Sequence, residues 1–313
     1  MKKIFLAVVA LAAMTACSND EFVSVDRAPI NFGEAFVDNA TRADYSSTQI
    51  KHFKVYGTVT GNSKTVNLYN GADVTGDAYG EIWTCNQKEY WIPNCEYVFQ
   101  AVVDGEISEG KIAYTIGQDT GSDDVSDLLY GEANVETDPA STPSGNVVTI
   151  DSKPVVEFTF SHLLSKVGFT FENSVGGSEY TYNVKAVAFT GHDSKGTFTI
   201  GGAWDNAYEA STTALEFGAP GVVDNTQVAA PTTHQIIPGA QILSVSFTYD
   251  ILFKDETVST DIVVTKPLEY TFERNHVYNI TVTLPAPGKE IVFTVKDTTG
   301  VNAWGDDNTV TVQ

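Results

Sequence analysis

Positive charge is scarce in this sequence. Its 313 residues include 18 Lys and Arg against 40 Asp and Glu, which gives a formal net charge of -22 at pH 7. A basic surface is needed to neutralise a phosphate backbone or to hold an anionic headgroup by charge. We therefore expect no nucleic-acid partner. The acidic excess also makes copies of the chain repel one another, so any assembly requires strong specific contacts.

The sequence also lacks the motifs of enzymes and metal sites. No HExxH, GxSxG, Walker A or GxGxxG pattern is present, and the histidines stand far apart. These are His52, His162, His192, His234 and His276. Acidic pairs such as Asp123 and Asp124 could bind calcium, but such pairs arise by chance among 40 acidic residues. We expect no enzyme activity, no cofactor and no metal ion.

Long apolar runs are absent except at the N-terminus. Two lysines, Lys2 and Lys3, precede the apolar run Ile4 to Met14. A run of about eleven residues is too short to cross a bilayer as a helix, so it is typical of a signal peptide over residues 1–16. The run ends in Met14-Thr15-Ala16-Cys17, which resembles a lipobox and predicts acylation of Cys17. An ordinary signal peptide followed by a chance cysteine is the alternative. The acidic stretch Ser18-Asn19-Asp20-Glu21 resembles the surface-export signal of Bacteroidales lipoproteins.

Only two further cysteines are present, Cys85 and Cys95. An exported protein can form a disulfide, so these two residues could be bridged. Both lie in aromatic, β-like sequence, and two buried free thiols are an equally good interpretation. Neither cysteine has the spacing of a zinc or redox motif, so we expect a structural role.

Many segments of the mature chain have apolar residues at every second position. Such alternation places one face of a β-strand against a core and the other in solvent. The clearest case is Leu243 to Phe253, and the pattern repeats at 53–59, 156–160 and 278–284. Turn sequences such as Tyr69-Asn70-Gly71 and Pro238-Gly239 separate the runs. We predict an all-β fold of antiparallel sandwiches, with 161–166 as the most helix-compatible stretch.

The length allows two domains of ordinary size. We place the junction near Ser161, with an N-terminal β-sandwich over 43–161 and a C-terminal one over 162–313. The acidic, small-residue region 117–145 is expected to be an excursion from the first sandwich. A strand at 196–200 is expected to belong to the second.

Three runs and the lipobox cysteine together resemble the Bacteroidales fimbrillin family, the subunits of type V pili. The resemblance covers essentially the whole mature chain. The run Asn39-Ala40-Thr41-Arg42-Ala43 is similar to that family's processing site. The other two runs resemble its interdomain segment and a late strand of its second domain. They are Phe158-Thr159-Phe160-Ser161-His162-Leu163-Leu164-Ser165-Lys166-Val167 and Phe272-Glu273-Arg274-Asn275-His276-Val277-Tyr278-Asn279-Ile280-Thr281-Val282.

The resemblance implies two transthyretin-like sandwiches in tandem and export to the outer membrane as a lipoprotein precursor. It implies that residues 17–42 are a propeptide, cut between Arg42 and Ala43 by an arginine-specific protease. Cutting would remove a first strand, in which Ile30, Phe32 and Phe36 could share one face. A strand from a neighbouring subunit would then fill the groove by β-strand addition. The partners implied are copies of this chain, together with tip and anchor subunits of an adhesive pilus.

The donor strand is expected at about 301–313, where Val301, Val310 and Val312 supply apolar side chains. Such a terminal segment could instead close its own sheet. Nearby, Asp297-Thr298-Thr299 resembles the Bacteroidales O-glycosylation motif, which would place a glycan on Thr298.

Other functions remain open at this stage. The chain could be a tip or anchor subunit of a pilus rather than a stalk subunit. It could also be a surface glycan-binding lipoprotein of a polysaccharide uptake system, with Trp83, Trp91 or Trp204 as sugar platforms, although such aromatics are more often core residues. A glycosidase would need two carboxyl groups facing each other across a cleft, which sequence alone does not reveal.

Overall fold

The computed structural model describes residues 28–37, 50–76, 82–116, 127–137, 147–148, 155–176, 179–205, 210–297 and 310–312. Every regular element in these ranges is a β-strand, which confirms the all-β prediction. Within the described ranges, no helix long and apolar enough to cross a membrane occurs. The helix-compatible stretch 161–166 contains the end of one strand and the start of the next, joined by Leu163 and Leu164.

The N-terminal part of the chain forms one eight-stranded sheet. In spatial order its strands are β1 (Asn31–Val37), β10 (Val155–His162), β8 (Leu129–Thr137), β5 (Cys95–Val103), β2 (His52–Gly61), β3 (Lys64–Thr75) and β4 (Thr84–Cys85), with β9 (Val147–Val148) beside β8. Most neighbours are antiparallel, but β1 runs parallel to β10. Alternate residues of β2 are buried, as predicted for 53–59. They face a core rich in aromatic rings.

The C-terminal part forms two sheets that share a core. One contains β17 (Val228–Ala229), β11 (Ser165–Asn173), β21 (Val277–Leu284), β22 (Val292–Asp297) and β23 (Val310–Val312), with β18 (His234–Ile236) paired to β11. The other contains β15 (Leu215–Gly218), β12 (Tyr180–Thr190), β19 (Gly239–Phe253) and β20 (Glu256–Phe272), with β16 (Gly221–Val223) paired to β12. Phe247 of β19 lies 5.5 Å from Phe171 and 6.4 Å from Phe293, between ring centroids. Side chains from the two sheets therefore meet in one sandwich core.

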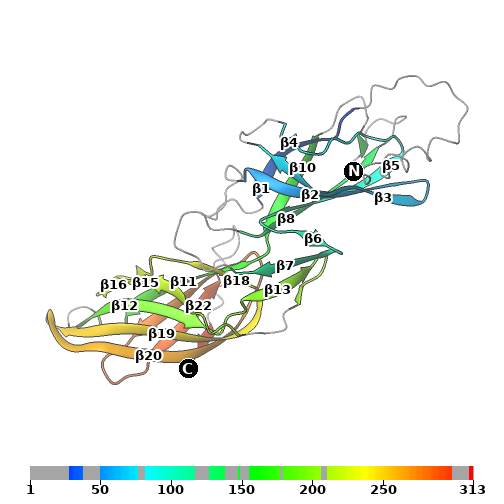
Figure 1. Ribbon diagram of the computed structural model, residues 1–313. Helices are drawn as coiled ribbons and strands as arrows, with labels where there is room; N and C mark the ends of the chain where they lie inside the picture. Colours follow the sequence, from blue (N-terminus) through cyan, green and yellow to red (C-terminus); the bar gives the residue numbers. More distant parts are fainter. Residues whose placement is uncertain are drawn as a thin grey trace, which may run out of the picture.

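A small fourth sheet joins the two parts. It contains β6 (Ile107–Ser108), β7 (Lys111–Thr115), β13 (Lys195–Thr199) and β14 (Trp204–Asp205). Strand β7 comes from the N-terminal part and pairs with β13 from the C-terminal part. Figure 1 shows this sheet between the large N-terminal sheet and the C-terminal sandwich. Assignment of 196–200 to the second sandwich was therefore wrong, since its pairing partner is β7.

The joining sheet covers its own apolar cluster, with Ile112, Phe198 and the two leucines between β10 and β11 at its centre. Trp204 donates from Nε1 to the Leu163 carbonyl oxygen, 2.8 Å away. Close by, His162 Nδ1 lies 2.5 Å from Asp127 Oδ2, and both side chains are buried. Contacts at this joint thus link segments from both parts of the chain.

The region 117–145 is more than the loop excursion predicted for it. Strand β8 lies within it and pairs with β5 along the whole of its length. Its polar residues Glu132, Asn134 and Glu136 point outward at every second position. These exposed polar positions contribute to the loop-like composition of the region, although residues 129–137 form a central strand.

Candidate functional site

The aromatic core of the N-terminal sheet is built around Phe32, next to the start of β1. The Phe32 side chain is fully buried, and its ring lies among the rings of Phe53, Tyr69, Phe99 and Phe158. The centroid distances from Phe32 to these rings run from 5.4 Å for Tyr69 to 6.4 Å for Phe53. Ala28 and Ile30 precede Phe32 at the same spacing and are also buried. The first strand therefore supplies a row of side chains to the core.

On one side this row of residues is held by the backbone of β10. Asn31 pairs with Val155 and Phe32 with Val156, in parallel register, before a bulge shifts the pairing by Ala35. The approach is close at Gly33, where a Cβ atom would lie 2.6 Å from Cγ1 of Val155. Figure 1 shows β1 alongside β10. A side chain at position 33 would therefore force Val155 or the strand backbone to shift.

On its other side the first strand is held by the segment 83–91. Ile30 donates its N–H to the Glu89 carbonyl oxygen at 2.9 Å. The Trp83 N–H donates to the Phe32 carbonyl oxygen at 2.9 Å, and the Trp91 N–H donates to Ala28 at 3.0 Å. Residues 28–32 therefore close the sheet between β10 and the segment after β3. Withdrawing them would leave a groove with two unpaired backbone edges and an empty aromatic pocket.

These contacts involve two of the three residues that the sequence predicted for the removable first strand. Ile30 and Phe32 both enter the core, as their alternation predicts. The backbone of Phe36 lies opposite Thr159. The pocket-lining rings of Phe53 and Phe158 belong to runs that alternation marked as strands. The irregular edge at Trp83 and Glu89 had no comparable signal in the sequence.

Other predicted site residues lie outside the described ranges: Cys17, Arg42, Ala43, Thr298 and Val301. For the C-terminal end, the structure pairs the backbones of Val310 and Val312 with Val295 and Phe293 of β22. In this arrangement the segment closes its own sheet, the alternative that the sequence left open. The described residues 310–312 of this segment lie at the edge of that sheet.

The two cysteines are free thiols, so the possible disulfide does not form. Cys85 pairs with Val74, which in turn pairs with Phe53 near the start of β2. Cys95 lies beside Glu96, which pairs with Thr60 at the far end of β2. The two thiols are separated by about eight strand residues, or about 25 Å along the sheet. Disulfide geometry requires Cα atoms within about 7 Å.

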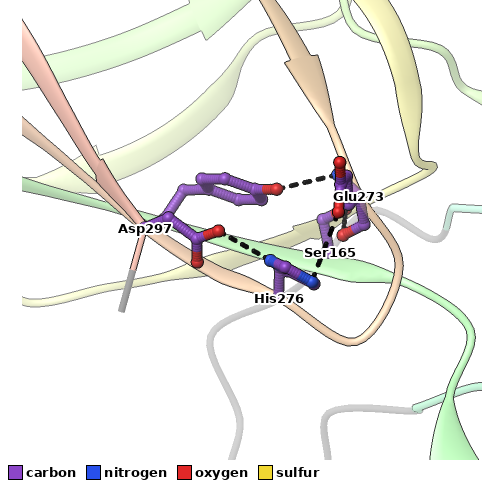
Figure 2. A network of polar contacts seen from close by, with 5 residues as sticks. Ser165, Glu273, His276 and Asp297 are labelled. Atoms are coloured by element: carbon purple, nitrogen blue, oxygen red, sulfur yellow. Dashed lines mark hydrogen bonds and ion pairs between the residues drawn. The ribbon is translucent and has the colours of Figure 1, made fainter. Parts of the chain in front are cut away.

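A polar network in the C-terminal sandwich contains a serine, a histidine and an aspartate, the residue types of a hydrolase triad. His276 Nδ1 lies 2.7 Å from Asp297 Oδ2, as Figure 2 shows. The Ser165 hydroxyl, however, donates to the Glu273 carbonyl oxygen at 2.9 Å instead of to the histidine. A nucleophilic serine must be hydrogen-bonded to its base. Ser165 is also buried, so the network is structural.

Two further expected sites can be compared with the structure. Trp83 and Trp91 are 6% and 2% exposed, so neither presents an indole face to a sugar. Trp204 is half-buried against Phe198 at 5.8 Å. In the described parts of the chain, no group of three His, Cys, Asp or Glu side chains is arranged to hold a metal ion.

Comparison with known proteins gives a family from the sequence and similar solved structures from the fold. A family model described as Fimbrillin-like matches residues 41–304. No curated protein matches the sequence. A fimbrial protein from Bacteroides vulgatus ATCC 8482 has a similar structure, with 16% sequence identity, a TM-score of 0.57 and coverage of 85% of this chain and 98% of that chain. A "putative cell adhesion protein" from Bacteroides ovatus ATCC 8483 has 17% identity and a TM-score of 0.52, with 87% and 98% of the two chains covered.

Proposed function

Because this chain belongs to the fimbrillin-like family, whose members are structural proteins and not enzymes, we propose that it is a pilus subunit that polymerises by strand exchange after proteolysis. The mature protein acts at the cell surface, in the fimbrium. Its precursor is lipidated at Cys17 and held at the outer membrane, until an arginine-specific protease cuts between Arg42 and Ala43. The observation that carries the proposal is the burial of Phe32 in a strand that lies on the N-terminal side of this bond in the sequence.

The contacts of the first strand supply the driving force for exchange. Burying a large apolar side chain is worth roughly 1.5 to 3 kcal/mol, so Ile30 and Phe32 together account for about 3 to 6 kcal/mol. The backbone hydrogen bonds to Trp83, Glu89 and Trp91 add to this. After cleavage the first strand is held only by noncovalent contacts of this kind, together with its parallel pairing with β10. A donor strand that reproduces them, and remains tethered to its own subunit, can displace it.

The donor that we propose is the segment from about Val301 to the C-terminus, with Val310 and Val312 directed into the groove. In the unassembled chain residues 310–312 pair with β22 at the sheet edge. A terminal strand at a sheet edge, paired on one side, is among the parts of a fold that open at the smallest cost. The partners in this proposal are neighbouring copies of the chain, and tip and anchor subunits at the ends of the pilus.

The experiment uses the unlipidated Cys17→Ala precursor and an arginine-specific protease. Products are examined by N-terminal sequencing and by denaturing gels run without boiling. We expect one new N-terminus at Ala43 and a ladder of heat-sensitive multimers. The Arg42→Ala variant should give no new N-terminus at position 43 and should stay monomeric, and a variant ending at Asp297 should be cut without forming the ladder.

Two outcomes would count against the stalk role, and a third would count against the proposed donor. Resistance of Arg42 to the protease removes the activation step. Cleavage with no multimers removes strand exchange and favours a tip or anchor subunit. A ladder formed by the variant ending at Asp297 would show that another segment is the donor. A glycan-binding role has no support from the tryptophans, of which Trp83 and Trp91 lie in the core.

A further inference from the structure

The sequence contains three arginines: Arg27, Arg42 and Arg274. In the sequence the first two stand on either side of β1, whereas Arg274 lies in a turn between β20 and β21. We propose that the segment Glu273–Tyr278, which comprises this turn and the first two residues of β21 and which we call the arginine latch, prevents cleavage after Arg274 and so confines arginine-specific processing to the N-terminal arginines. The biological purpose of the latch rests on the proposed function, but its protease resistance can be measured independently of it.

Cleavage at Arg274 would damage the fold. Hydrolysis of the Arg274–Asn275 bond would consume one water and leave a carboxylate on Arg274 and an amine on Asn275. The released segment would contain β21, which lies between β11 and β22 in the six-stranded sheet. Strand β21 pairs with β11 from Lys166 to Asn173, and its Ile280 and Val282 side chains are fully buried. A cut here would separate a central strand from the rest of the chain.

The backbone of the latch does not have the extended conformation that a protease active site binds. A protease active site binds its substrate as an extended segment, by β-strand addition. Asn275 has a φ of 62°, in the left-handed region, and its N–H donates to the Leu164 carbonyl oxygen at 3.0 Å. On the other side of the turn the Lys166 N–H donates to the His276 carbonyl oxygen at 2.9 Å. The bond after Arg274 is therefore bent and fixed against the start of β11.

Side chains fix the residues on both sides of Arg274, as Figure 2 shows. The Glu273 N–H donates to the Tyr278 hydroxyl oxygen at 2.9 Å, and the Glu273 carbonyl oxygen accepts from Ser165. The His276 ring bridges two carboxylates, with Nδ1 2.7 Å from Asp297 and Nε2 3.5 Å from Glu273. Straightening the turn would require all of these contacts to open together.

The arginine side chain itself is also engaged. Although Arg274 is exposed, its guanidinium carbon lies 5.2 Å from the centre of the Phe198 ring on β13. A cation held over an aromatic face gains electrostatic attraction. An arginine-specific protease must draw this guanidinium into its own pocket. Exposure alone is therefore not enough to make Arg274 a substrate.

The test treats the full unlipidated chain with an arginine-specific protease and follows the products by mass spectrometry. In the native protein we expect cleavage after Arg274 to be on the order of a hundredfold slower than at the same bond in urea, because local opening is required first. The Tyr278→Phe variant keeps the ring but removes the acceptor of the Glu273 N–H. We expect it to cleave about tenfold faster after Arg274 than the wild type.

A matched control is Tyr182→Phe, since the Tyr182 hydroxyl also makes one hydrogen bond in the same sandwich, to the Pro285 carbonyl oxygen at 2.5 Å. If both variants raise the rate equally, global unfolding is the cause and the latch is wrong. Rapid native cleavage at Arg274, or equal resistance in urea, would also overturn it. Resistance of both Arg274 and Arg42 in the native chain would support the latch while counting against the proposed function.

Discussion

The ring of Phe32 stacks on the ring of Phe158, with centroids 6.2 Å apart and 15° between the planes. The two residues lie on neighbouring parallel segments, separated in sequence by most of the N-terminal sheet. Phe53 meets both rings from the opposite strand, at 6.4 Å and 5.4 Å. The first strand is therefore part of the core, in contrast to a tail laid over a completed fold.

Truncating Phe32 should be costly for the unprocessed chain. We expect Phe32→Ala to lower the free energy of unfolding by about 3 to 5 kcal/mol, because it removes a fully buried ring and leaves a cavity. Chemical denaturation of the unlipidated precursor measures this. The control is Glu157→Ala, an exposed residue on the adjacent strand β10, which should change stability by less than about 0.5 kcal/mol. Equal effects of the two substitutions would contradict the placement of Phe32.

The two cysteines should remain reduced in the folded protein even under oxidising conditions. Burial raises the pKa of the Cys85 thiol and of the Cys95 thiol above the usual value. A raised pKa means less thiolate at a given pH. Alkylation of these two thiols should therefore be slower than that of a solvent-exposed cysteine, and it should accelerate only at more alkaline pH. Mass spectrometry after alkylation should detect a modification on both Cys85 and Cys95. A stable Cys85–Cys95 bridge in the native monomer would show that the strand register is wrong.

The sequence predicted those parts of the fold in which local alternation and burial coincide. The run Leu243 to Phe253 forms most of β19, and its odd-numbered residues up to 251 are buried. Residues Ile30 and Phe32 entered the core for the same reason. Alternation did not identify the central strand β8, in which three polar side chains point outward.

What the sequence could not predict are pairings between distant segments. Strand β7 ends at Thr115 and β13 begins only at Lys195, and each strand alone is five residues long. Nothing in either strand specifies the other, because pairing register depends on the whole surrounding fold. The groove edge at Trp83 and Glu89 could not be predicted from the sequence either. It is formed by irregular backbone, whose hydrogen bonds leave no periodic signature.

The joint between the two parts should make them unfold together. Ile112 of β7 is fully buried and pairs with Phe198 of β13. We expect Ile112→Ala to destabilise the chain by about 2 to 5 kcal/mol and to separate unfolding into two transitions, since the core that couples the parts is weakened. Tryptophan fluorescence and far-ultraviolet circular dichroism should coincide in urea for the wild type and diverge for the variant. Coinciding curves for the variant would mean that the β7–β13 pairing is not what couples them.

Acid should destabilise the C-terminal sandwich through His192. This side chain is 3% exposed, and burial, assisted by the nearby His234, lowers its pKa to about 4. The unfolded chain has a histidine pKa of about 6.5, so between these values the unfolded state binds a proton that the folded state excludes. Stability must then rise with pH across this window, and it is lost as the pH falls from about 6.5 towards 4.

At pH 5 the loss from His192 amounts to about 2 kcal/mol relative to pH 7.5, from the linkage between the two pKa values. The variant His192→Gln keeps a neutral polar side chain at every pH, so it should lack this part of the acid sensitivity. Comparing the two proteins by urea denaturation at both pH values cancels the contributions of the carboxylates that they share. An equal loss of stability in the wild type and the variant would mean that His192 accepts a proton within the fold. The sandwich would then have to open around this residue, because a charged imidazole with this little exposure would otherwise lack solvation.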